Sequence, residues 1–189
     1  DGALALRMVP VGETFSRFQR VVRDTSKQLG KEIEFNITGG DTELDKSMVE
    51  LIADPLMHLV RNSLDHGLEL PSEREAAGKS PVGRLDLNAC HEGGCIVIEV
   101  RDDGRGLRRE RILGKAIERG LVPEGAVLSD AEVWQLIFAP GFSTADKVTD
   151  LSGRGVGMDV VKRNIEALRG QISLSSTEGH GTRTQIRLP

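Results

Sequence analysis

The chain has 189 residues, of which 38% are hydrophobic, and this length suits one domain with a sizeable core. Its 25 lysines and arginines are outnumbered by 29 acidic residues, and the net charge of −4 does not favour binding to nucleic acid or to an anionic membrane. No apolar run approaches the roughly 18 residues that span a bilayer, and two cysteines are too few for a zinc site, so we expect a cytoplasmic protein without membrane insertion.

The first third of the chain reads as helix, strand and helix. Hydrophobic periodicity predicts these elements over residues 13–29, 32–38 and 45–67. Gly30 is well placed to end the first helix. The second helical stretch contains Asp54 and Pro55. Because aspartate is a good N-cap and proline suits the first turn of a helix, we expect this helix to break and restart at Pro55.

The rest of the chain begins with a polar, charged segment over residues 69–83, which we expect to be a surface excursion. The next elements are predicted in the order strand, strand, helix, helix, helix, strand and strand, over residues 84–91, 96–101, 108–119, 130–138, 158–168, 172–176 and 182–188. This order predicts the α+β class, in which a two-layer α/β sandwich packs helices on one face of a mixed, mostly antiparallel sheet.

The helix that follows Pro55 has one apolar side and one polar side. Its apolar residues fall at helical spacing and are expected to face the core: they are Leu56, Met57, Val60 and Leu64. His58, Asn62 and Asp65 are spaced i, i+4 and i+7, so they share a polar stripe. An amide oxygen and a carboxylate are hard oxygen ligands, and histidine can carry a proton, so this stripe suits a metal-bound polyanion. A solvated helix face explains the same pattern.

Two glycine-rich segments follow later in the chain. In the first, Asp102-x-Gly104-x-Gly106, a carboxylate ends a strand beside backbone that no side chain obstructs, which suits the exocyclic amine of a flat ring such as adenine. The same residues also mark many plain turns. In the second, residues 153–157 precede a helix, and their exposed N–H groups form a candidate phosphate cradle. Met158 stands where a dinucleotide fingerprint needs glycine, and the P-loop spacing is absent.

Taken in this order, the three segments resemble the ATP-binding fold shared by histidine kinases, DNA gyrase, the MutL repair proteins and a heat-shock chaperone. The residues of these segments that carry the resemblance are 58–67, 100–107 and 151–161, and a further stretch, residues 140–144, adds to it. Within that superfamily the chain is most similar to the catalytic domain of CheA-like chemotaxis histidine kinases, and the similarity spans nearly its whole length. His58 makes this distinction, because ordinary sensor kinases carry glutamate at that place in the helix.

This resemblance implies roles for individual residues. His58 and Asn62 would be the catalytic pair, with Asn62 as the Mg²⁺ ligand and His58 as a second candidate ligand. Asp102 would bind the amine of adenine. The residues assigned to nucleotide binding are Asn62, Asp65, His66, Asp102, Gly104, Gly106, Gly153, Arg154, Gly155, Val156, Gly157, Met158 and Thr182. The residues assigned to a lid over ATP are Gly141, Phe142, Ser143 and Thr144.

The resemblance also implies a reaction and partners. ATP, as substrate with Mg²⁺, would give its γ-phosphoryl group to a histidine on a separate acceptor domain of the same or a partner subunit. The chain looks like a piece of a longer protein, with residues 1–8 ending a dimerisation or linker segment and residues 9–189 forming the kinase domain. The parent protein would be a homodimer that works with an adaptor, receptors and response regulators.

Two other functions fit part of the pattern. An ATPase of the gyrase or MutL type would share the first two segments, but such enzymes place glutamate near position 58 to activate water, and this chain has His58. A nucleotide-binding signalling module without kinase activity would share all three segments. Phosphate release without an acceptor would identify the ATPase, and a transfer assay with an acceptor domain would identify the module.

Overall fold

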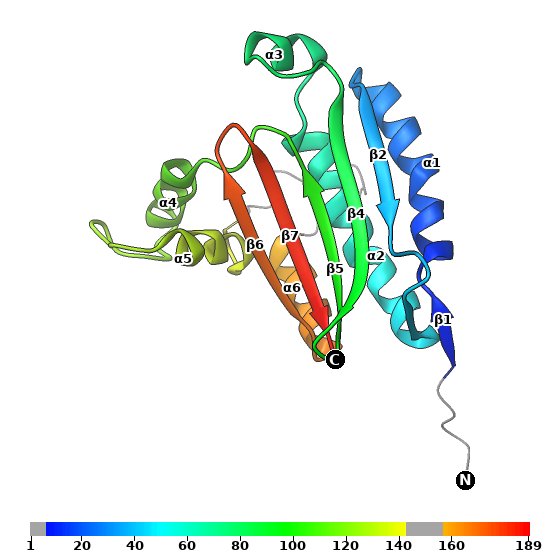
Figure 1. Cartoon of the computed structure of the whole chain (residues 1–189). Coiled ribbons are helices and arrows are strands. Elements are labelled where there is room, and N and C mark those ends of the chain that lie inside the picture. Colours follow the sequence, from blue (N-terminus) through cyan, green and yellow to red (C-terminus); the bar gives the residue numbers. More distant parts are fainter. Residues whose placement is uncertain (1–6, 143–156) are drawn as a thin grey trace.

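The computed structural model describes residues 7–142 and 157–189. Its centre is a five-stranded sheet with helices against one face (Figure 1). The sheet has the strand order β2 (Ile33–Thr38), β4 (Gly83–Glu92), β5 (Cys95–Asp102), β7 (Gly181–Leu188) and β6 (Gln171–Thr177). β2 and β4 are parallel, and the other neighbouring pairs are antiparallel. The predicted fold class, a two-layer sandwich with a mixed and mostly antiparallel sheet, is confirmed.

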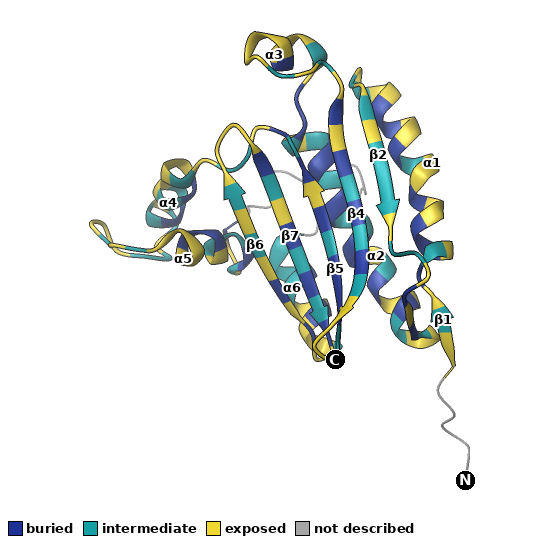
Figure 2. Cartoon of the chain, viewed as in Figure 1, coloured by how far each residue is buried: buried dark blue, intermediate teal, exposed yellow. Residues whose placement is uncertain are grey.

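Three helices cover the inner face of the sheet. They are α1 (Gly12–Leu29), α2 (Lys46–Asn62) and α6 (Met158–Ala167), and each carries a set of buried residues; Figure 2 shows buried and exposed residues alternating along α1. The largest fully buried apolar side chains lie in this layer, among them Phe15, Leu56, Ile98 and Ile165. Burial of each such side chain stabilises the fold by about 1.5–3 kcal/mol. The sheet and these helices therefore form one continuous core.

Glycines form two of the turns that were predicted from the sequence, at the end of α1 and between β4 and β5. Gly30 closes α1 in the left-handed conformation, with φ of 69°, as expected of a glycine C-cap. The β4–β5 hairpin turns through Gly93 and Gly94, whose φ angles are 57° and 82°, between the paired residues Glu92 and Cys95. Positive φ at both central residues is the pattern of a type I′ turn, which matches the twist of the strands that it joins.

The predicted break at Pro55 is wrong. α2 runs without interruption from Lys46 to Asn62, with Pro55 buried inside it, and Asp45 is its N-cap. A proline in a helix interior costs about 3 kcal/mol. Leu56 and Val60, on the same helix, are fully buried, and their burial offsets that cost. The chain continues from α2 into a π-helical turn, η2 (Ser63–Gly67).

The segment over residues 69–83 is more than the predicted surface excursion. It contains a short helix, α3 (Pro71–Ala76), and Arg74 is 1% exposed. Sequence periodicity missed this because a helix of one and a half turns has too few apolar residues to show a pattern. A two-stranded sheet of β1 (Met8–Pro10) and β3 (Glu43–Asp45) was not predicted either.

A second, smaller core lies beside the edge strand β6. It is built by α4 (Arg109–Glu118), α5 (Asp130–Gln135) and the 3₁₀ turn η3 (Leu136–Phe138), and Figure 1 shows these elements to one side of the main layers. Its buried residues are Ile112, Ala116, Val133, Trp134 and Phe142. Both helices were predicted from the sequence. Within the two described ranges, no helix is long and apolar enough to cross a membrane.

Two leucines on α2 offer a test of this core. Leu56 is fully buried and Leu51 is 59% exposed on the same helix. We expect Leu56→Ala to lower the free energy of unfolding by about 2–5 kcal/mol, because the site is closely packed on every side. Leu51→Ala should change it by no more than about 0.5 kcal/mol. Urea unfolding followed by circular dichroism measures both, and equal effects would contradict this packing.

Candidate functional site

The polar stripe of α2 and η2 lies at the edge of the core. His58, Asn62 and Asp65 are half-buried, whereas Leu56 and Val60 on the opposite side are fully buried. The predicted amphipathic arrangement of this segment is therefore present. The side chain of Asn62 donates through Nδ2 to the sulfur of Met158 at 3.2 Å, which joins the end of α2 to the first residue of α6.

The residue after Asn62 joins α2 to the aspartate at the end of β5. Ser63 is buried, and its hydroxyl donates to Oδ2 of Asp102 at 2.8 Å. Adjacent residues at the end of α2 therefore contact both later segments, Asn62 at the start of α6 and Ser63 at Asp102. The sequence prediction did not include Ser63. The feature of the sequence that could have identified Ser63 is its position three residues after Val60, which places a hydroxyl group on the buried side of the helix.

Asp102 is the most deeply buried carboxylate of the site, with 6% of its surface exposed. Its Oδ1 accepts a hydrogen bond from the backbone N–H of Gly104 at 2.9 Å, in addition to the bond from Ser63. Burial raises the pKa of this carboxyl above its usual value, while the bonds from Gly104, Ser63 and the backbone of Thr182 act in the opposite direction. An ionised carboxylate offers about four lone-pair sites, so Asp102 keeps capacity for a further donor.

The glycines of the Asp102-x-Gly104-x-Gly106 segment are required by the fold as well. A Cβ on Gly104 would lie 2.0 Å from the carbonyl oxygen of Gly67. Gly106 has φ of 71°, and a Cβ there would lie 2.3 Å from the carbonyl oxygen of Thr177. These close approaches bring the turn after β5 against η2 on one side and against the end of β6 on the other. The fold by itself therefore requires glycine at both positions.

Thr182 lies directly opposite Asp102 in the β5–β7 pairing. Its hydroxyl is 3.1 Å from the hydroxyl of Ser176, and the Ser176 hydroxyl also accepts from the backbone N–H of Leu107 at 2.8 Å. The β6–β7 hairpin therefore binds the backbone at Leu107, directly after the Asp102-x-Gly104-x-Gly106 segment. The structure therefore brings Thr182 next to Asp102.

Asp65 and His66 lie on η2. Nε2 of His66 lies 3.1 Å from Oδ2 of Asp65, and the side chain of His66 is 73% exposed. Lys31, which the prediction did not include, donates through Nζ to the carbonyl oxygens of Leu64 and Asp65 at 2.6 and 3.0 Å. Burial lowers the pKa of Lys31, and the nearby Asp65 carboxylate opposes that change. Lys31, which lies just before β2, thus binds two backbone carbonyl groups of η2.

The third segment is described only in part. Gly157 is the N-cap of α6 and Met158 is its first residue. Gly153, Arg154, Gly155 and Val156 lie outside the described residues, as do Ser143 and Thr144 of the predicted lid. Of the other lid residues, Phe142 is 7% exposed in the second core, and the Nζ atom of Lys115 lies 4.8 Å from the centre of its ring.

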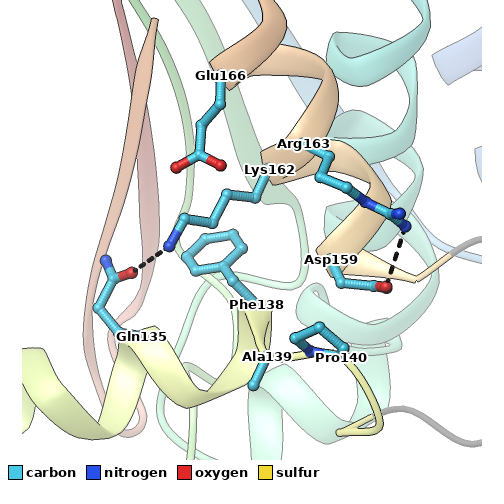
Figure 3. Close-up of a pocket in the computed structure, with 8 residues that line it drawn as sticks. All are labelled: Gln135, Phe138, Ala139, Pro140, Asp159, Lys162, Arg163 and Glu166. Atoms are coloured by element: carbon cyan, nitrogen blue, oxygen red, sulfur yellow. Dashed lines mark hydrogen bonds and ion pairs between the residues drawn. The ribbon is translucent and has the colours of Figure 1, made fainter.

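A cavity of about 390 Å³ lies between η3 and α6 (Figure 3). Its lining includes Phe138, Pro140, Lys162 and Glu166, and none of the predicted site residues. Lys162 reaches Gln135 at 3.5 Å on one side of it, as the close-up shows. The cavity is therefore separate from the convergence of Asn62, Ser63 and Asp102.

Residues 52–189 match the family model described as histidine kinase-, DNA gyrase B- and HSP90-like ATPase. The chemotaxis protein CheA of Salmonella typhimurium is 56% identical over 189 residues, which are all of this chain and 28% of that protein. The chemotaxis protein CheA of Bacillus subtilis is 51% identical over 188 residues, 98% of this chain and 28% of that protein. The chain thus spans less than a third of the length of either relative.

Solved structures of histidine kinase domains share the fold along nearly the whole length of this chain. The catalytic domain of the histidine kinase ThkA, in a nucleotide-free form, superposes with a TM-score of 0.61 at 16% identity, covering 98% of this chain and 96% of that one. The histidine kinase domain of the blue-light-activated kinase of Erythrobacter litoralis gives 0.54 at 17% identity, covering 100% of this chain and 70% of that one. At these identities the likeness concerns the fold.

The close approach at Gly104 can be tested with a second glycine as control. We expect Gly104→Ala to destabilise the chain by about 1–3 kcal/mol, since the new Cβ would overlap the Gly67 carbonyl and force the turn to move. Gly114, inside α4, has no atom within 4 Å of an added Cβ. Gly114→Ala should therefore stabilise the chain by about 0.5–1 kcal/mol. Urea unfolding distinguishes the two, and a harmless Gly104→Ala would contradict this geometry.

Proposed function

Since the chain belongs to the family of histidine kinase-, DNA gyrase B- and HSP90-like ATPases, we propose that it is the ATP-binding catalytic domain of a chemotaxis-type protein histidine kinase. The observation that carries the proposal is the convergence at the end of α2. There, Asn62 and Ser63 contact the start of α6 and the buried Asp102. The described parts of the segments that suggested metal, base and phosphate binding meet there, which supports a single site.

Asp102 is the proposed adenine-binding residue. Its carboxylate is fixed by Ser63 and Gly104, so it can accept a hydrogen bond from the exocyclic amine of the base without first becoming ordered. A buried acceptor also selects its ligand, because a base without the amine leaves the carboxylate unpaired. Thr182, Gly104 and Gly106 would border the base on the same side.

The metal is proposed to arrive with the nucleotide. In the described ranges, no three His, Cys, Asp or Glu side chains are grouped so that they could hold a metal ion. Asn62 is half-buried, and its amide nitrogen is bound to Met158, so its oxygen is the atom suited to a hard cation. This fits Mg²⁺, which binds proteins through one or two oxygen ligands and completes its shell with phosphate oxygens and water. Bound there, Mg²⁺ would neutralise phosphate charge.

The phosphates are proposed to lie at the start of α6. Gly157 and Met158 begin this ten-residue helix, whose first N–H groups and dipole favour anions. The remaining candidates, Gly153, Arg154, Gly155 and Val156, are proposed from sequence. Asp65 and His66 on η2 are proposed to border the same ligand. Residues 141–144 are proposed as the lid.

The proposed reaction transfers the γ-phosphoryl group of ATP to a histidine on an acceptor domain of the same or a partner subunit. Such transfer depends mainly on alignment of the reacting groups and on neutralised charge. His58, four residues before Asn62, is proposed to orient or deprotonate the incoming imidazole. Residues 9–189 would form the kinase domain of a cytoplasmic, homodimeric parent protein that works with an adaptor, receptors and response regulators.

The alternatives differ from this proposal in what happens to the γ-phosphoryl group. An ATPase of the gyrase or MutL type would release phosphate without an acceptor, and glutamate rather than His58 would then be expected to activate water. A signalling module would bind ATP and transfer nothing. The residue at position 58 favours the kinase over the first alternative. The relatives named as chemotaxis proteins support a signalling function over the first alternative.

The nucleotide site is tested by calorimetry with a non-hydrolysable ATP analogue. We expect binding that depends on Mg²⁺ and that falls on addition of a chelator. Asp102→Asn should weaken it by about ten- to a hundredfold, because the buried acceptor of the amine loses its charge. Asp24→Asn, an exposed acid on α1, is the matched control. No binding by folded wild-type chain would overturn the proposal.

The kinase reaction is tested with the acceptor domain of the parent protein and labelled ATP. We expect transfer to a histidine of that domain, and His58→Gln should slow it by about 10²–10⁴-fold at unchanged ATP affinity. His91→Gln, at an exposed position of β4, should leave the rate unchanged. Full activity of His58→Gln would remove the proposed role of His58, and phosphate release with no transfer would favour the ATPase.

A further inference from the structure

Behind the turn that follows Asp102 lies a cluster of charged side chains from the segment that looked like a surface excursion. Arg74 and Glu69 are 1% and 8% exposed, and their ion pair joins Nη1 to Oε1 at 2.8 Å. Lys79 contacts the other oxygen of the same carboxylate, with Nζ–Oε2 at 2.8 Å. One buried carboxylate thus holds two cations side by side. We name Glu69, Arg74 and Lys79 the cation clamp.

Both cations of the clamp bind the backbone of the Asp102 segment. Nη1 of Arg74 and Nζ of Lys79 each donate to the carbonyl oxygen of Asp103 at 3.1 Å. Lys79 also donates to the carbonyl oxygen of Gly104 at 2.7 Å. Arg74 further pairs through Nη2 with the carboxylate of Asp103 at 3.1 Å. Two successive carbonyl groups therefore point into the clamp.

The opposite sides of the same two peptide groups face the candidate site. The N–H of Gly104 shares a peptide plane with the Asp103 carbonyl, and it donates to Oδ1 of Asp102 at 2.9 Å. The N–H of Arg105 shares a plane with the Gly104 carbonyl, and it donates to the Gly67 carbonyl oxygen at 2.9 Å. Because a trans peptide is planar, fixing the direction of its C=O also fixes the direction of its N–H. Cations at the oxygen also polarise the group and strengthen the N–H as a donor.

We propose that Lys79 and Arg74 are positioning residues that fix the orientation of the Asp102 carboxylate and thereby set the preference of the site for a base with an exocyclic amine. This rests on the proposed function, because it assumes that Asp102 accepts from the base. Stability alone is a weak reason for such a cluster, since buried ion pairs are often no more stable than apolar replacements. The clamp instead specifies the direction of two peptide groups.

The test compares ATP with inosine triphosphate, whose base carries an oxygen in place of the amine. Calorimetric titrations of the whole chain with each nucleotide and Mg²⁺ give the ratio of the two affinities. We expect Lys79→Met to lower ATP affinity about tenfold or more, because a small displacement of the Asp102 carboxylate weakens its hydrogen bond to the base. Affinity for inosine triphosphate should change far less, so the preference for ATP falls. Lys79→Arg keeps a cation and should retain most of the preference.

Arg187→Met removes an exposed ion pair with Glu92 at the other end of the sheet, and it should leave both affinities unchanged. Glu69→Gln keeps the side-chain shape but removes the charge that holds both cations. This variant replaces Lys79→Met in the test if Lys79→Met does not fold. The same fall in preference is expected. A variant that only lost stability would bind both nucleotides in the original ratio below its unfolding temperature, and that outcome would overturn the inference.

Asp102→Asn separates this inference from the proposed function. If the wild-type chain prefers ATP and Asp102→Asn loses the preference while the clamp variants keep it, the inference fails and the proposed function stands. If the wild-type chain binds neither nucleotide, both fail. Loss of preference in Asp102→Asn and in the clamp variants, but not in Arg187→Met, supports both.

Discussion

A carboxylate buried at the end of a central strand must find hydrogen-bond donors, and much of the structure around β5 supplies them to Asp102. Ser63 reaches it from the end of α2, and Gly104 folds its own N–H back onto it. Burial nevertheless raises the pKa of the carboxyl, and its two oxygens offer about four acceptor positions, more than these donors occupy. An acceptor that is ordered but incompletely satisfied is suited to a ligand that brings a further donor.

Close backbone contact is the second constraint. Three chain segments meet at the turn after β5, and they come together only because Gly104 and Gly106 lack side chains. The same residues would let a flat ring approach, so one chemical property serves both the fold and the proposed site. Lys31 and the cation clamp then hold this convergence from two sides, through backbone carbonyl groups rather than through the side chains proposed to touch the ligand.

The helix α2 connects core and site. Its buried side, with Leu56 and Val60, is packed firmly enough to keep Pro55 within a continuous helix, and its polar side together with η2 carries polar groups of the candidate site. A rigid helix defines the position of Asn62 and Ser63 relative to the sheet. The π-helical turn then alters the helical path just where the chain must bring Gly67 against the Asp102 segment.

The sequence by itself determined the fold class, the family and the candidate residues Asn62, Asp102 and Thr182, because periodicity and short motifs are local and legible in one chain. The continuous course of α2 through Pro55 was decided by tertiary packing, which outweighed a local rule. Lys31 and the cation clamp were also beyond sequence reasoning, and the local signal for Ser63 did not identify its partner. Ser63 and its partner Asp102 are 39 residues apart in the sequence. Nothing in the residues around Arg74 marks this side chain as buried. Spacing along the chain indicates which residues can act, whereas contacts between distant segments decide what holds them in place.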